Sequence, residues 1–266
     1  MFGRTSPANR RFFFRHDGSP ADLVDLFAGQ AVFLIGNGPS FAEVDHSLLH
    51  RPGILTMTMN NGGHLFRSSL WIAQDSPHRF MPSIWHDPKM MKFTKLEHSH
   101  SPISETVSTD PRPTIVGDCP NVFFYRVSKR FRREQWATRR SADWGCTWKG
   151  KARGSTLVAA IHVLFKLGFR TLYLLGADFN MSASRNYFFA EQHIRQVVDE
   201  NNELYVALRE FFVDLEPVFR EHGLMIYNCT EGSHLDVFPH LGLAEAVSRH
   251  AISLDATTEG MYRRDA

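Results

Sequence analysis

AVFLIGNGPS, residues 31–40, joins a continuous apolar run to a loop that contains two glycines. The run from Ala31 to Ile35 is short, apolar and partly β-branched, which is typical of a strand buried on both faces of a parallel sheet. The loop follows at the carboxyl end of this strand, where open α/β sheets bind ligands. Because glycine has no Cβ atom, its backbone N–H group can turn toward an anion. We therefore predict a nucleotide-binding loop made of Gly36, Asn37, Gly38, Pro39 and Ser40.

This loop differs from the common phosphate-binding fingerprints. No glycine lies three residues after Gly38, and no Gly-Lys-Ser/Thr sequence follows, so the loop is neither G-x-G-x-x-G nor a Walker loop. A dehydrogenase and a P-loop kinase are therefore disfavoured. The Asn37 amide offers contacts to a base, ribose or phosphate. A tight turn that binds no ligand is the alternative interpretation.

The rest of the chain alternates apolar strands with helices. Strands are predicted over residues 53–59, 69–74, 122–127, 171–178 and 224–230. Helices are predicted over 155–168 with Ser155 as the cap, over 194–222 with a break or kink at Pro217, and over 241–251. This order predicts an α/β fold with a Rossmann-like, mostly parallel sheet and helices on both faces.

Prolines concentrate in one part of the chain and predict an irregular segment over residues 76–121. With the basic stretch that follows, this segment forms a predicted insertion at about 76–150 in a catalytic domain spanning 31–250. Residues 1–30 are predicted to be an N-terminal arm and 251–266 a tail. The prolines are Pro77, Pro82, Pro88, Pro102, Pro111, Pro113 and Pro120.

Composition describes an ordinary globular protein. Of 266 residues, 43% are hydrophobic and 22% charged, which excludes disordered, collagen-like and fibrous classes. The net charge of +2 is a small difference between 30 basic and 28 acidic residues and predicts no partner by itself. The three aromatic residues 12–14 are predicted either to pack on a second copy, forming a homo-oligomer, or to pack into the core of this chain.

Cysteine usage and apolar runs predict a cytoplasmic protein. Cys119, Cys146 and Cys229 are odd in number and far apart, so they form neither a zinc cage nor a disulfide framework. The apolar run 157–165 is far shorter than the roughly 20 residues of a membrane helix, so no membrane span is predicted. The N-terminus lacks the apolar region of a secretory signal.

Several motifs occur in an order that resembles one known superfamily. They are GNGPS (36–40), MTMNNGG (57–63), GSTLVAAIHVLFKLGFRTLYLLGADF (154–179) and IYNCTEGSHLDVFP (226–239). The superfamily contains bacterial lipooligosaccharide-type sialyltransferases, motility accessory factor proteins and archaeal 6-hydroxymethylpterin pyrophosphokinases. The resemblance spans residues 31 to 247, apart from 76–150, and implies a GT-A-like variant of the predicted fold.

The resemblance implies a set of nucleotide-binding residues. In the sialyltransferases, the first loop and the asparagine after the second strand hold a cytidine nucleotide. The helix start contributes backbone N–H groups that favour an anion. Tyr187 matches one of two phosphate-binding tyrosines, but the other position is Asn180, which puts a tyrosine pair and a CMP-sialic acid donor in doubt. The set adds Asn60, Ser155, Thr156 and Tyr187 to the first loop. Thr230 and Glu231, in the polar loop after the last strand, together with Asp75 and Gly154, complete the predicted nucleotide-binding residues.

Glycosyl transfer needs a base for the acceptor hydroxyl, and histidine titrates near neutral pH. His193 lies roughly where the resemblance places the catalytic histidine, and His234 lies in the loop after the last strand. A surface or structural role is the alternative for both. Asp178 is a third catalytic candidate, with a strand-end cap as its alternative role. Glu231 could bind a divalent ion, but no second carboxylate is spaced to help it, so no metal is assigned.

A basic and aromatic stretch covers residues 126–155. Cations interleaved with aromatic faces are what phosphate backbones and unstacked bases bind. The stretch is therefore predicted to bind nucleic acid, with the donor phosphates or a solvated surface as alternatives. The candidate residues are Arg130, Arg132, Arg133, Trp136, Arg139, Arg140, Trp144, Trp148, Lys149, Lys151 and Arg153.

These observations predict a nucleotide-sugar-dependent glycosyltransferase. Its donor is CMP- or UDP-linked, and no other cofactor is predicted. The acceptor is either a hydroxymethylated pyrimidine in DNA, as in phage DNA modification, which requires base flipping, or a surface glycan. One alternative is a pterin-type pyrophosphokinase that uses ATP and Mg²⁺, with carboxylates converging near Asp75, Asp178 or Glu231. The other is a nucleotide- or nucleic-acid-binding module without activity.

Overall fold

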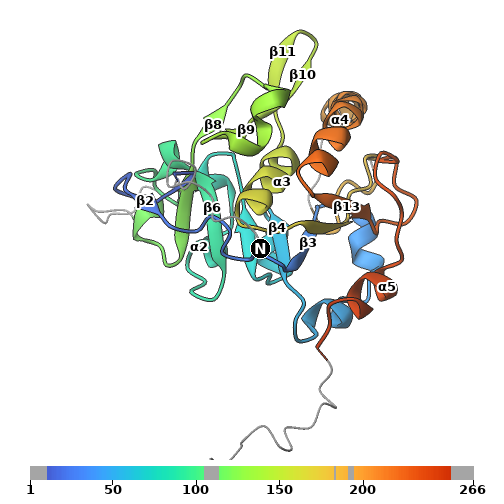
Figure 1. Ribbon diagram of the computed structural model, residues 1–266, viewed down its shortest axis with the longest axis horizontal. Coiled ribbons are helices and arrows are strands. Elements are labelled where there is room, and N and C mark those ends of the chain that lie inside the picture. Colours follow the sequence, from blue (N-terminus) through green and yellow to red (C-terminus); the bar gives the residue numbers. More distant parts are fainter. Residues whose placement is uncertain (1–10, 105–113, 183, 191–194, 253–266) are drawn as a thin grey trace, which may run out of the picture.

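A nine-stranded sheet runs through the middle of the protein (Figure 1). The structure is a computed structural model that describes residues 11–104, 114–182, 184–190 and 195–252. The strands lie in the order β13-β12-β3-β4-β5-β6-β7-β1-β2. All neighbours from β13 to β7 are parallel, whereas β1 and β2 are antiparallel. The sheet strands are β1 Phe13–Phe14, β2 Pro20–Ala21, β3 Ala31–Ile35, β4 Thr56–Met59, β5 Leu70–Ile72, β6 Met91–Lys95, β7 Val122–Tyr125, β12 Thr171–Leu175 and β13 Met225–Asn228.

Helices cover both faces of this sheet, which confirms the α/β prediction. Figure 1 shows α3 and α4 on one side and α2 and α5 on the other. The side chains of β3 alternate accordingly: Val32 and Leu34 join the core under α3 and α4, and Phe33 and Ile35 join the core on the opposite face. The helices are α1 Gly62–Leu65, α2 Pro82–Trp85, α3 Thr156–Lys166, α4 Arg195–Glu221 and α5 Leu243–Ser248.

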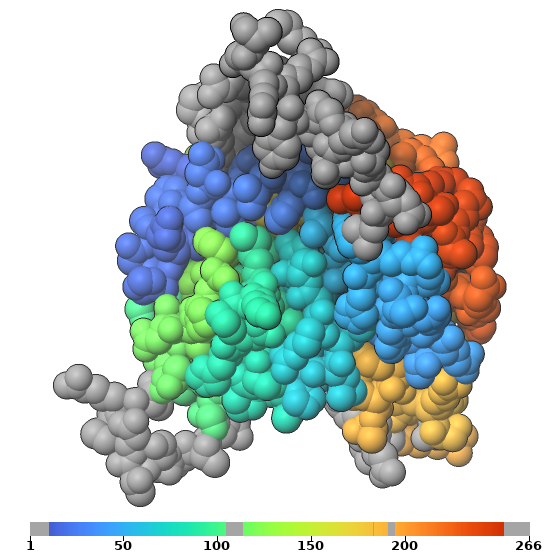
Figure 2. Space-filling view, turned by 90° about the horizontal axis from the view of Figure 1, so that it is seen from below, coloured from blue at the N-terminus to red at the C-terminus, as the bar shows by residue number. Residues whose placement is uncertain are grey.

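Short 3-10 turns complete several connections. The turn Arg133–Thr138 lies on the face of α3 and α4, where Trp136 packs, and the others lie on the face of α2 and α5. Figure 2 shows this face, with the N-terminal and C-terminal segments at opposite sides of it. This arrangement follows the strand order, because β2 and β13 are the two edges of the sheet. The turns along the chain are η2 Pro39–Glu43, η3 His46–His50, η4 Pro77–Arg79, η5 Leu96–His98, η6 Val116–Asp118 and η7 Arg133–Thr138.

The segment predicted to be irregular contains a central strand. The prolines predict no regular structure over 76–121, but β6 lies between β5 and β7 in the sheet. This strand is difficult to predict from the sequence because Lys92 interrupts the apolar run. The Lys92 side chain is nevertheless fully buried. Its ammonium donates hydrogen bonds to the carbonyl oxygens of Asp87 at 2.5 Å and Met90 at 2.9 Å. A charged residue can therefore occupy a central strand when backbone carbonyls satisfy its donors.

The N-terminal residues also belong to the sheet. Phe13 pairs with Tyr125 of β7, and Phe12 and Phe13 are fully buried. Phe12 packs against Phe13 and His162, at centroid distances of 4.9 and 5.4 Å. Of the two roles predicted for residues 12–14, the structure therefore shows packing into the core of this chain.

The basic stretch folds into small elements above the sheet. β8 (Val127–Ser128) pairs with β9 (Ala142–Asp143), and β10 (Gly145–Trp148) forms a hairpin with β11 (Lys151–Gly154). This hairpin stands beside α4 in Figure 1. The chain passes directly from the hairpin into α3, so the basic stretch adjoins the start of that helix.

The long helix α4 continues through Pro217 rather than ending there. Proline lacks the N–H that would bond to the carbonyl four residues earlier, at Val213. Val213 is 50% exposed, so water can satisfy that carbonyl. Leu215, Val218 and Phe219 are buried against the sheet, and this packing holds the helix together across the proline.

Candidate functional site

The loops that follow β3 and β12 pack backbone against backbone. Gly36 donates its N–H to the Leu175 carbonyl at 2.7 Å, and Gly38 donates to the Gly176 carbonyl at 2.9 Å. A Cβ atom on Gly36 would lie 2.4 Å from the Gly176 oxygen. The two glycines are therefore required by contact between the loops. This differs from the sequence-based expectation that their N–H groups face an anion.

Asp178 holds the first loop in place. Its Oδ1 accepts a hydrogen bond from the Ser40 backbone N–H at 3.1 Å, and its Oδ2 accepts one from the Ser40 hydroxyl at 2.8 Å. A Cβ atom on Gly38 would lie 1.8 Å from the same Oδ2 atom. Both carboxylate oxygens thus have partners within the protein. This geometry supports the strand-end cap rather than a catalytic role for Asp178.

Two adjoining cavities lie at the carboxyl edge of the sheet. The glycine-loop cavity has a volume of about 120 Å³ and is lined by Gly36, Asn37, Gly38, Ser155, Asp178 and Tyr187, among others. The asparagine cavity has a volume of about 140 Å³ and is lined by Asn37, Asn60, Asp75 and Tyr187, among others. Asn37 and Tyr187 line both cavities. The fold therefore brings together eight of the predicted site residues.

The asparagines in these cavities carry unsatisfied acceptors. The Oδ1 atoms of Asn37 and Asn60 are buried and have no hydrogen-bond partner. Asn60 also adopts a left-handed backbone conformation, with φ of 51°. A buried acceptor without a donor costs about 1–3 kcal/mol, so such atoms require an explanation. A ligand donor that enters the cavities would supply the missing partner.

Unsatisfied atoms recur along the same edge of the sheet. Among the described residues, seven buried side-chain atoms lack partners, and five of them lie at the carboxyl ends of the successive strands β3 to β7. Buried polar atoms without hydrogen-bond partners are thus concentrated at the edge where a parallel sheet binds ligands. The five residues are Asn37, Asn60, Gln74, Thr94 and Tyr125.

Helix α3 directs its N-terminus toward the glycine-loop cavity, which Ser155 and Leu157 line. The Ser155 hydroxyl caps the Val158 N–H at 3.5 Å. The Ser155 carbonyl accepts a hydrogen bond from Gln74 Nε2 at 2.9 Å, which ties the helix start to the end of β5. The earliest N–H groups of a helix have no intrahelical acceptor and carry partial positive charge, so this end favours an anion. Neither Gly154 nor Thr156 lines the cavity.

Tyr205 on α4 is a site residue that the sequence analysis missed. Its side chain lines the glycine-loop cavity together with Tyr187. Its ring lies 5.2 Å from that of Phe179, and burial raises the pKa of its hydroxyl. Tyr205 and Leu208 share one face of α4, but the apolar period of the predicted helix does not indicate which cavity that face lines. Asn180, where the resemblance places a tyrosine, lines the same cavity.

Three predicted site residues, Pro39, Thr230 and Glu231, lie outside the cavities. The buried Thr230 hydroxyl accepts a hydrogen bond from the Ala177 N–H at 3.1 Å, so it supports the backbone next to Asp178. The Glu231 side chain is 84% exposed and lies 3.3 Å from His240 Nε2. Pro39 begins the turn η2 and does not line either cavity. These three predicted residues contact neighbouring protein groups instead of the cavities.

Of the two predicted catalytic histidines, the structure describes His234, which lines neither cavity. His234 is exposed, and its backbone N–H donates to the Asp178 carbonyl at 2.9 Å, while its ring lines neither cavity. His193 lies outside the described residues. Another histidine, His98, also lines neither cavity, but its Nε2 lies 3.3 Å from the carbonyl oxygen of Gln74, the residue before Asp75 of the asparagine cavity. Burial and the Lys95 ammonium lower the pKa of His98, which favours a neutral ring.

Two residues of the predicted nucleic-acid set are buried or paired inside the protein. Trp136 is 1% exposed, and its ring packs against His162 at 4.9 Å and Phe165 at 4.6 Å. The prediction that Trp136 binds nucleic acid is therefore wrong, because the core surrounds its ring. Arg139 donates to the Asp143 carboxylate at 2.6 Å, and both side chains are largely buried. The Arg139 guanidinium therefore binds a carboxylate of the protein itself.

The other members of the set lie nearer the surface. Lys149 pairs with Glu203 at 2.5 Å, and the cations of Lys149 and Arg153 lie 4.5 and 5.4 Å from the Trp148 ring. Trp144 is half-buried. The exposed cations are Arg130, Arg132, Arg133, Arg140, Lys149, Lys151 and Arg153.

Within the described part of the chain, no group of three or more His, Cys, Asp or Glu side chains is placed to hold a metal ion. Asp75 lies 3.8 Å from Arg79, whereas Asp178 is held by Ser40. Within the same residues, no helix is long and apolar enough to cross a membrane.

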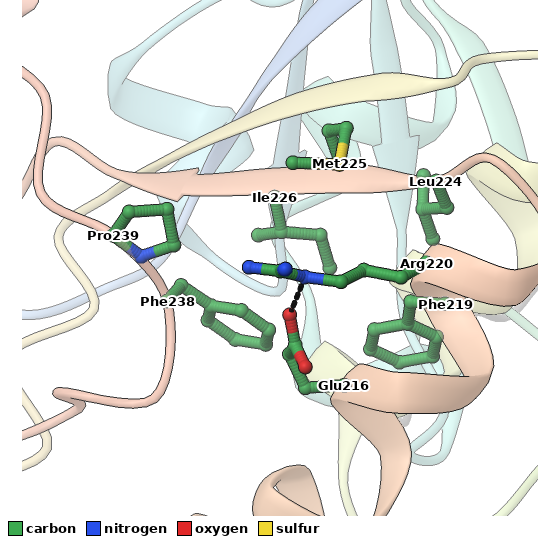
Figure 3. A pocket seen from close by; sticks show the side chains of 8 residues that line it. All are labelled: Glu216, Phe219, Arg220, Leu224, Met225, Ile226, Phe238 and Pro239. Carbon is green, nitrogen blue, oxygen red and sulfur yellow. Dashed lines mark hydrogen bonds and ion pairs between the residues drawn. The ribbon is translucent and has the colours of Figure 1, made fainter.

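A further hollow lies between the end of α4 and β13 (Figure 3). Its volume is about 10 Å³, which is the space of roughly one water molecule. The ion pair between Glu216 and Arg220 lies at this hollow, with Phe238 beside it. The hollow is therefore a packing feature and no ligand site.

Comparison with known proteins gives two distant structural likenesses. No family model and no curated protein matches the sequence. The sialyltransferase CstII from Campylobacter jejuni, in complex with the substrate analogue cytidine-5'-monophosphate, has 13% identity and a TM-score of 0.44 over 81% of this chain and 86% of that chain. A mammalian sialyltransferase in complex with Gal-beta-1-3GalNAc-ortho-nitrophenol has 11% identity and a TM-score of 0.39 over 79% and 74% of the two chains. The functional assignment of this chain therefore depends on its own residues.

Proposed function

We propose that this chain is a nucleotide-sugar-dependent glycosyltransferase with a CMP- or UDP-linked donor. The observation that carries the proposal is the pair of buried, unsatisfied oxygens of Asn37 and Asn60 in the adjoining cavities. Cytosine presents an exocyclic amine and uracil a ring N–H, so either base can donate to an amide oxygen. Ribose hydroxyls can donate in the same way. A pyrimidine nucleotide thus supplies the donors that this site lacks.

The remaining groups around the cavities suit the rest of such a donor. The N-terminus of α3, which borders the glycine-loop cavity, favours the phosphate of such a donor. Tyr187 lines both cavities, and its proposed role is to donate a hydrogen bond to the leaving phosphate. Tyr205 supplies a second hydroxyl in the glycine-loop cavity. The raised pKa of Tyr205 keeps that hydroxyl protonated and able to donate.

The pyrophosphokinase alternative requires carboxylates that converge on a metal. Asp178 lines the glycine-loop cavity, Asp75 lines the asparagine cavity, and Glu231 lines neither. The three carboxylates predicted for that reaction are thus distributed over separate places. This distribution favours the glycosyltransferase.

The base that deprotonates the acceptor is assigned to His193 or His98. The Gln74 carbonyl accepts the Nε2 proton of His98, which leaves Nδ1 free to take a proton. Substitutions His193→Gln and His98→Gln, tested separately, distinguish the two. Loss of kcat and of the acidic limb of the pH–rate profile in one variant identifies the base. Unchanged profiles in both variants would exclude both residues.

A thermal-shift panel with CMP, UDP, GDP and ATP, each with and without Mg²⁺, tests the proposal, because a ligand that binds only the folded state raises Tm. We expect stabilisation by CMP or UDP without metal. Stabilisation by ATP only in the presence of Mg²⁺ would support the pyrophosphokinase, and no shift with any nucleotide would overturn the nucleotide site.

The substitution Asn37→Ala tests whether this one residue is required for nucleotide binding. It should abolish nucleotide binding without lowering the Tm of the free protein, because it removes a buried oxygen that has no partner. Asn201→Ala, on α4 and outside both cavities, is the control. Unchanged nucleotide affinity of Asn37→Ala in a calorimetric titration would contradict the assignment.

A further inference from the structure

A larger groove lies between the basic stretch and α4. Its volume is about 670 Å³, compared with about 120 Å³ for the glycine-loop cavity. We call it the charged groove and define it by Lys129, Arg130, Arg132, Trp144, Glu210 and Asp214. One wall comes from the chain that leads into β10, and the other comes from α4. The groove is thus separate from the two cavities described above.

The charges in this groove are unpaired. Three cations on one wall and two carboxylates on the other make no side-chain hydrogen bond and no ion pair with any described residue. Neighbouring charges do pair: Lys149 with Glu203 at 2.5 Å, and Arg209 with Asp236 at 2.6 Å. Charges of both signs therefore remain available to a ligand in the groove.

Aromatic rings add apolar surface between the charged walls. Phe131 and Phe211 line the groove and meet edge to face at a centroid distance of 4.9 Å. Trp144 lines it as well, with the Lys95 and Lys129 ammonium groups 4.9 and 5.6 Å from its ring centre. Aromatic faces stabilise the C–H faces of sugar rings as well as nucleobases. The aromatic rings alone therefore do not show whether the groove binds a sugar or a nucleobase.

The groove adjoins the glycine-loop cavity through two shared elements. The Trp144 carbonyl accepts a hydrogen bond from the Ser155 N–H at 2.9 Å, and Ser155 lines the cavity. On α4, Tyr205 and Leu208 line the cavity, while Glu210 and Phe211 line the groove. A chain bound in the groove can therefore extend toward the cavity past the start of α3.

We propose that the charged groove binds a neutral oligosaccharide, as the part of the acceptor remote from the reacting hydroxyl. A sugar hydroxyl both donates and accepts, so it can donate to Glu210 or Asp214 and accept from Arg130 or Arg132. A polyanion such as DNA uses only the cations and is repelled by the two carboxylates. The acceptor role rests on the proposed glycosyltransferase function, whereas binding to the groove can be measured without it.

The double variant Glu210→Gln/Asp214→Asn distinguishes the two ligands, because it should lower the affinity for an oligosaccharide and raise the affinity for DNA. A panel of neutral tri- and tetrasaccharides and a short single-stranded DNA serve as probes in calorimetric titrations at fixed salt. We expect the double variant to weaken oligosaccharide binding about tenfold, because charge-assisted hydrogen bonds to two carboxylates become weaker bonds to neutral amide oxygens. Both carboxylates are exposed, so the Tm of the variant should stay unchanged.

Nucleic acid gives the opposite result. If DNA occupies the groove, the double variant should bind it more tightly, because two repulsive charges are removed. Tighter DNA binding, or no oligosaccharide binding by the wild-type protein, would overturn the proposal. Glu221→Gln, an exposed carboxylate on the same helix outside the groove, is the control and should change neither affinity.

Parallel titrations with CMP and UDP separate this proposal from the proposed function. Loss of oligosaccharide binding in the double variant with nucleotide binding intact supports the groove. Nucleotide binding without any oligosaccharide binding would overturn the groove alone. Oligosaccharide binding without any nucleotide binding would overturn the glycosyltransferase and leave a glycan-binding groove.

Discussion

The glycine-loop cavity and the charged groove share α4 as a wall but differ in how their walls are made. The cavity depends on backbone contacts, such as Gly38 against Gly176, and its one carboxylate, Asp178, is satisfied by Ser40. The groove presents exposed charged side chains that make no side-chain hydrogen bond or ion pair with any described residue. Substitutions in the cavity loops should therefore change stability together with binding. Substitutions on the groove walls should change binding alone.

A buried cluster of charged and polar side chains nevertheless lies next to the groove in the chain. Asp143 of β9 is 1% exposed and contacts Arg139 at 2.6 Å and His162 Nδ1 at 3.4 Å. The cluster lies directly before Trp144 and the β10–β11 hairpin. The stability of the groove is thus determined by residues that a ligand never contacts. Four predictions test this contrast.

Asp143→Ala should have the largest effect. It leaves the Arg139 guanidinium without its buried partner, and such a loss typically costs about 3–5 kcal/mol. Urea unfolding measures the change. Asp236→Ala, which breaks a surface pair with Arg209 at 2.6 Å, is the control and should cost less than about 1 kcal/mol. Equal losses in the two variants would contradict the buried cluster.

Gly38→Ala should destabilise the cavity side by about 2–3 kcal/mol, because the added Cβ overlaps Asp178 Oδ2 and the Gly176 oxygen. Nucleotide binding should be lost at the same time. Gly242→Ala is the matched control, since a Cβ there meets nothing within 4 Å. A Tm equal to wild type in Gly38→Ala would show that the loop contact is not required.

Ser40→Ala should cost about 1.5 kcal/mol, since it removes one hydrogen bond to the Asp178 carboxylate and keeps the backbone one. Thermal unfolding in the absence of nucleotide measures this loss. Ser248→Ala removes an exposed bond to the Glu245 carbonyl and is the control. If both variants lose the same amount, Asp178 does not hold the loop.

Lys166→Met should show its effect as a dependence of stability on pH. Burial lowers the pKa of Lys166 from 10.5 to about 8. Between these values the unfolded chain keeps a proton that the folded chain has released, so folding becomes more favourable as pH rises. We expect the stability of wild type relative to Lys166→Met to increase from pH 8 upward. A constant difference between pH 7 and pH 10 would contradict the lowered pKa.

The order of elements around the site is predictable from the sequence. Residues 31–35 and 171–175 are apolar runs with clear ends, and Ser155 is a strong N-cap, so β3, β12 and α3 follow from local rules. Because the carboxyl ends of parallel strands share one edge, the loop residues were also predicted to meet. Asn37, Asn60 and Asp178 lie together for this reason.

The parts that could not be predicted depend on contacts between distant segments. Trp136 and Trp144 lie in the same basic stretch, but only Trp136 is enclosed, by α3 and the end of α4. Tyr205 reaches the cavity from a helix whose position the sequence does not specify. Lys92 occupies β6 because two carbonyls happen to lie within reach of its ammonium. Local periodicity contains none of this information.

The pairing of β1 with β7 has a consequence for synthesis of the chain. Phe13 leaves the ribosome early, but its partner Tyr125 follows only after most of the parallel strands have been made. Until then, the two aromatic residues Phe12 and Phe13 have no core to enter, and once β7 has been made its edge stays open until β1 pairs with it. Pairing over such a distance slows folding, and an uncovered edge favours association between chains. Closure of the sheet by β1 is therefore expected to be a late step in folding and the point at which aggregation competes with it.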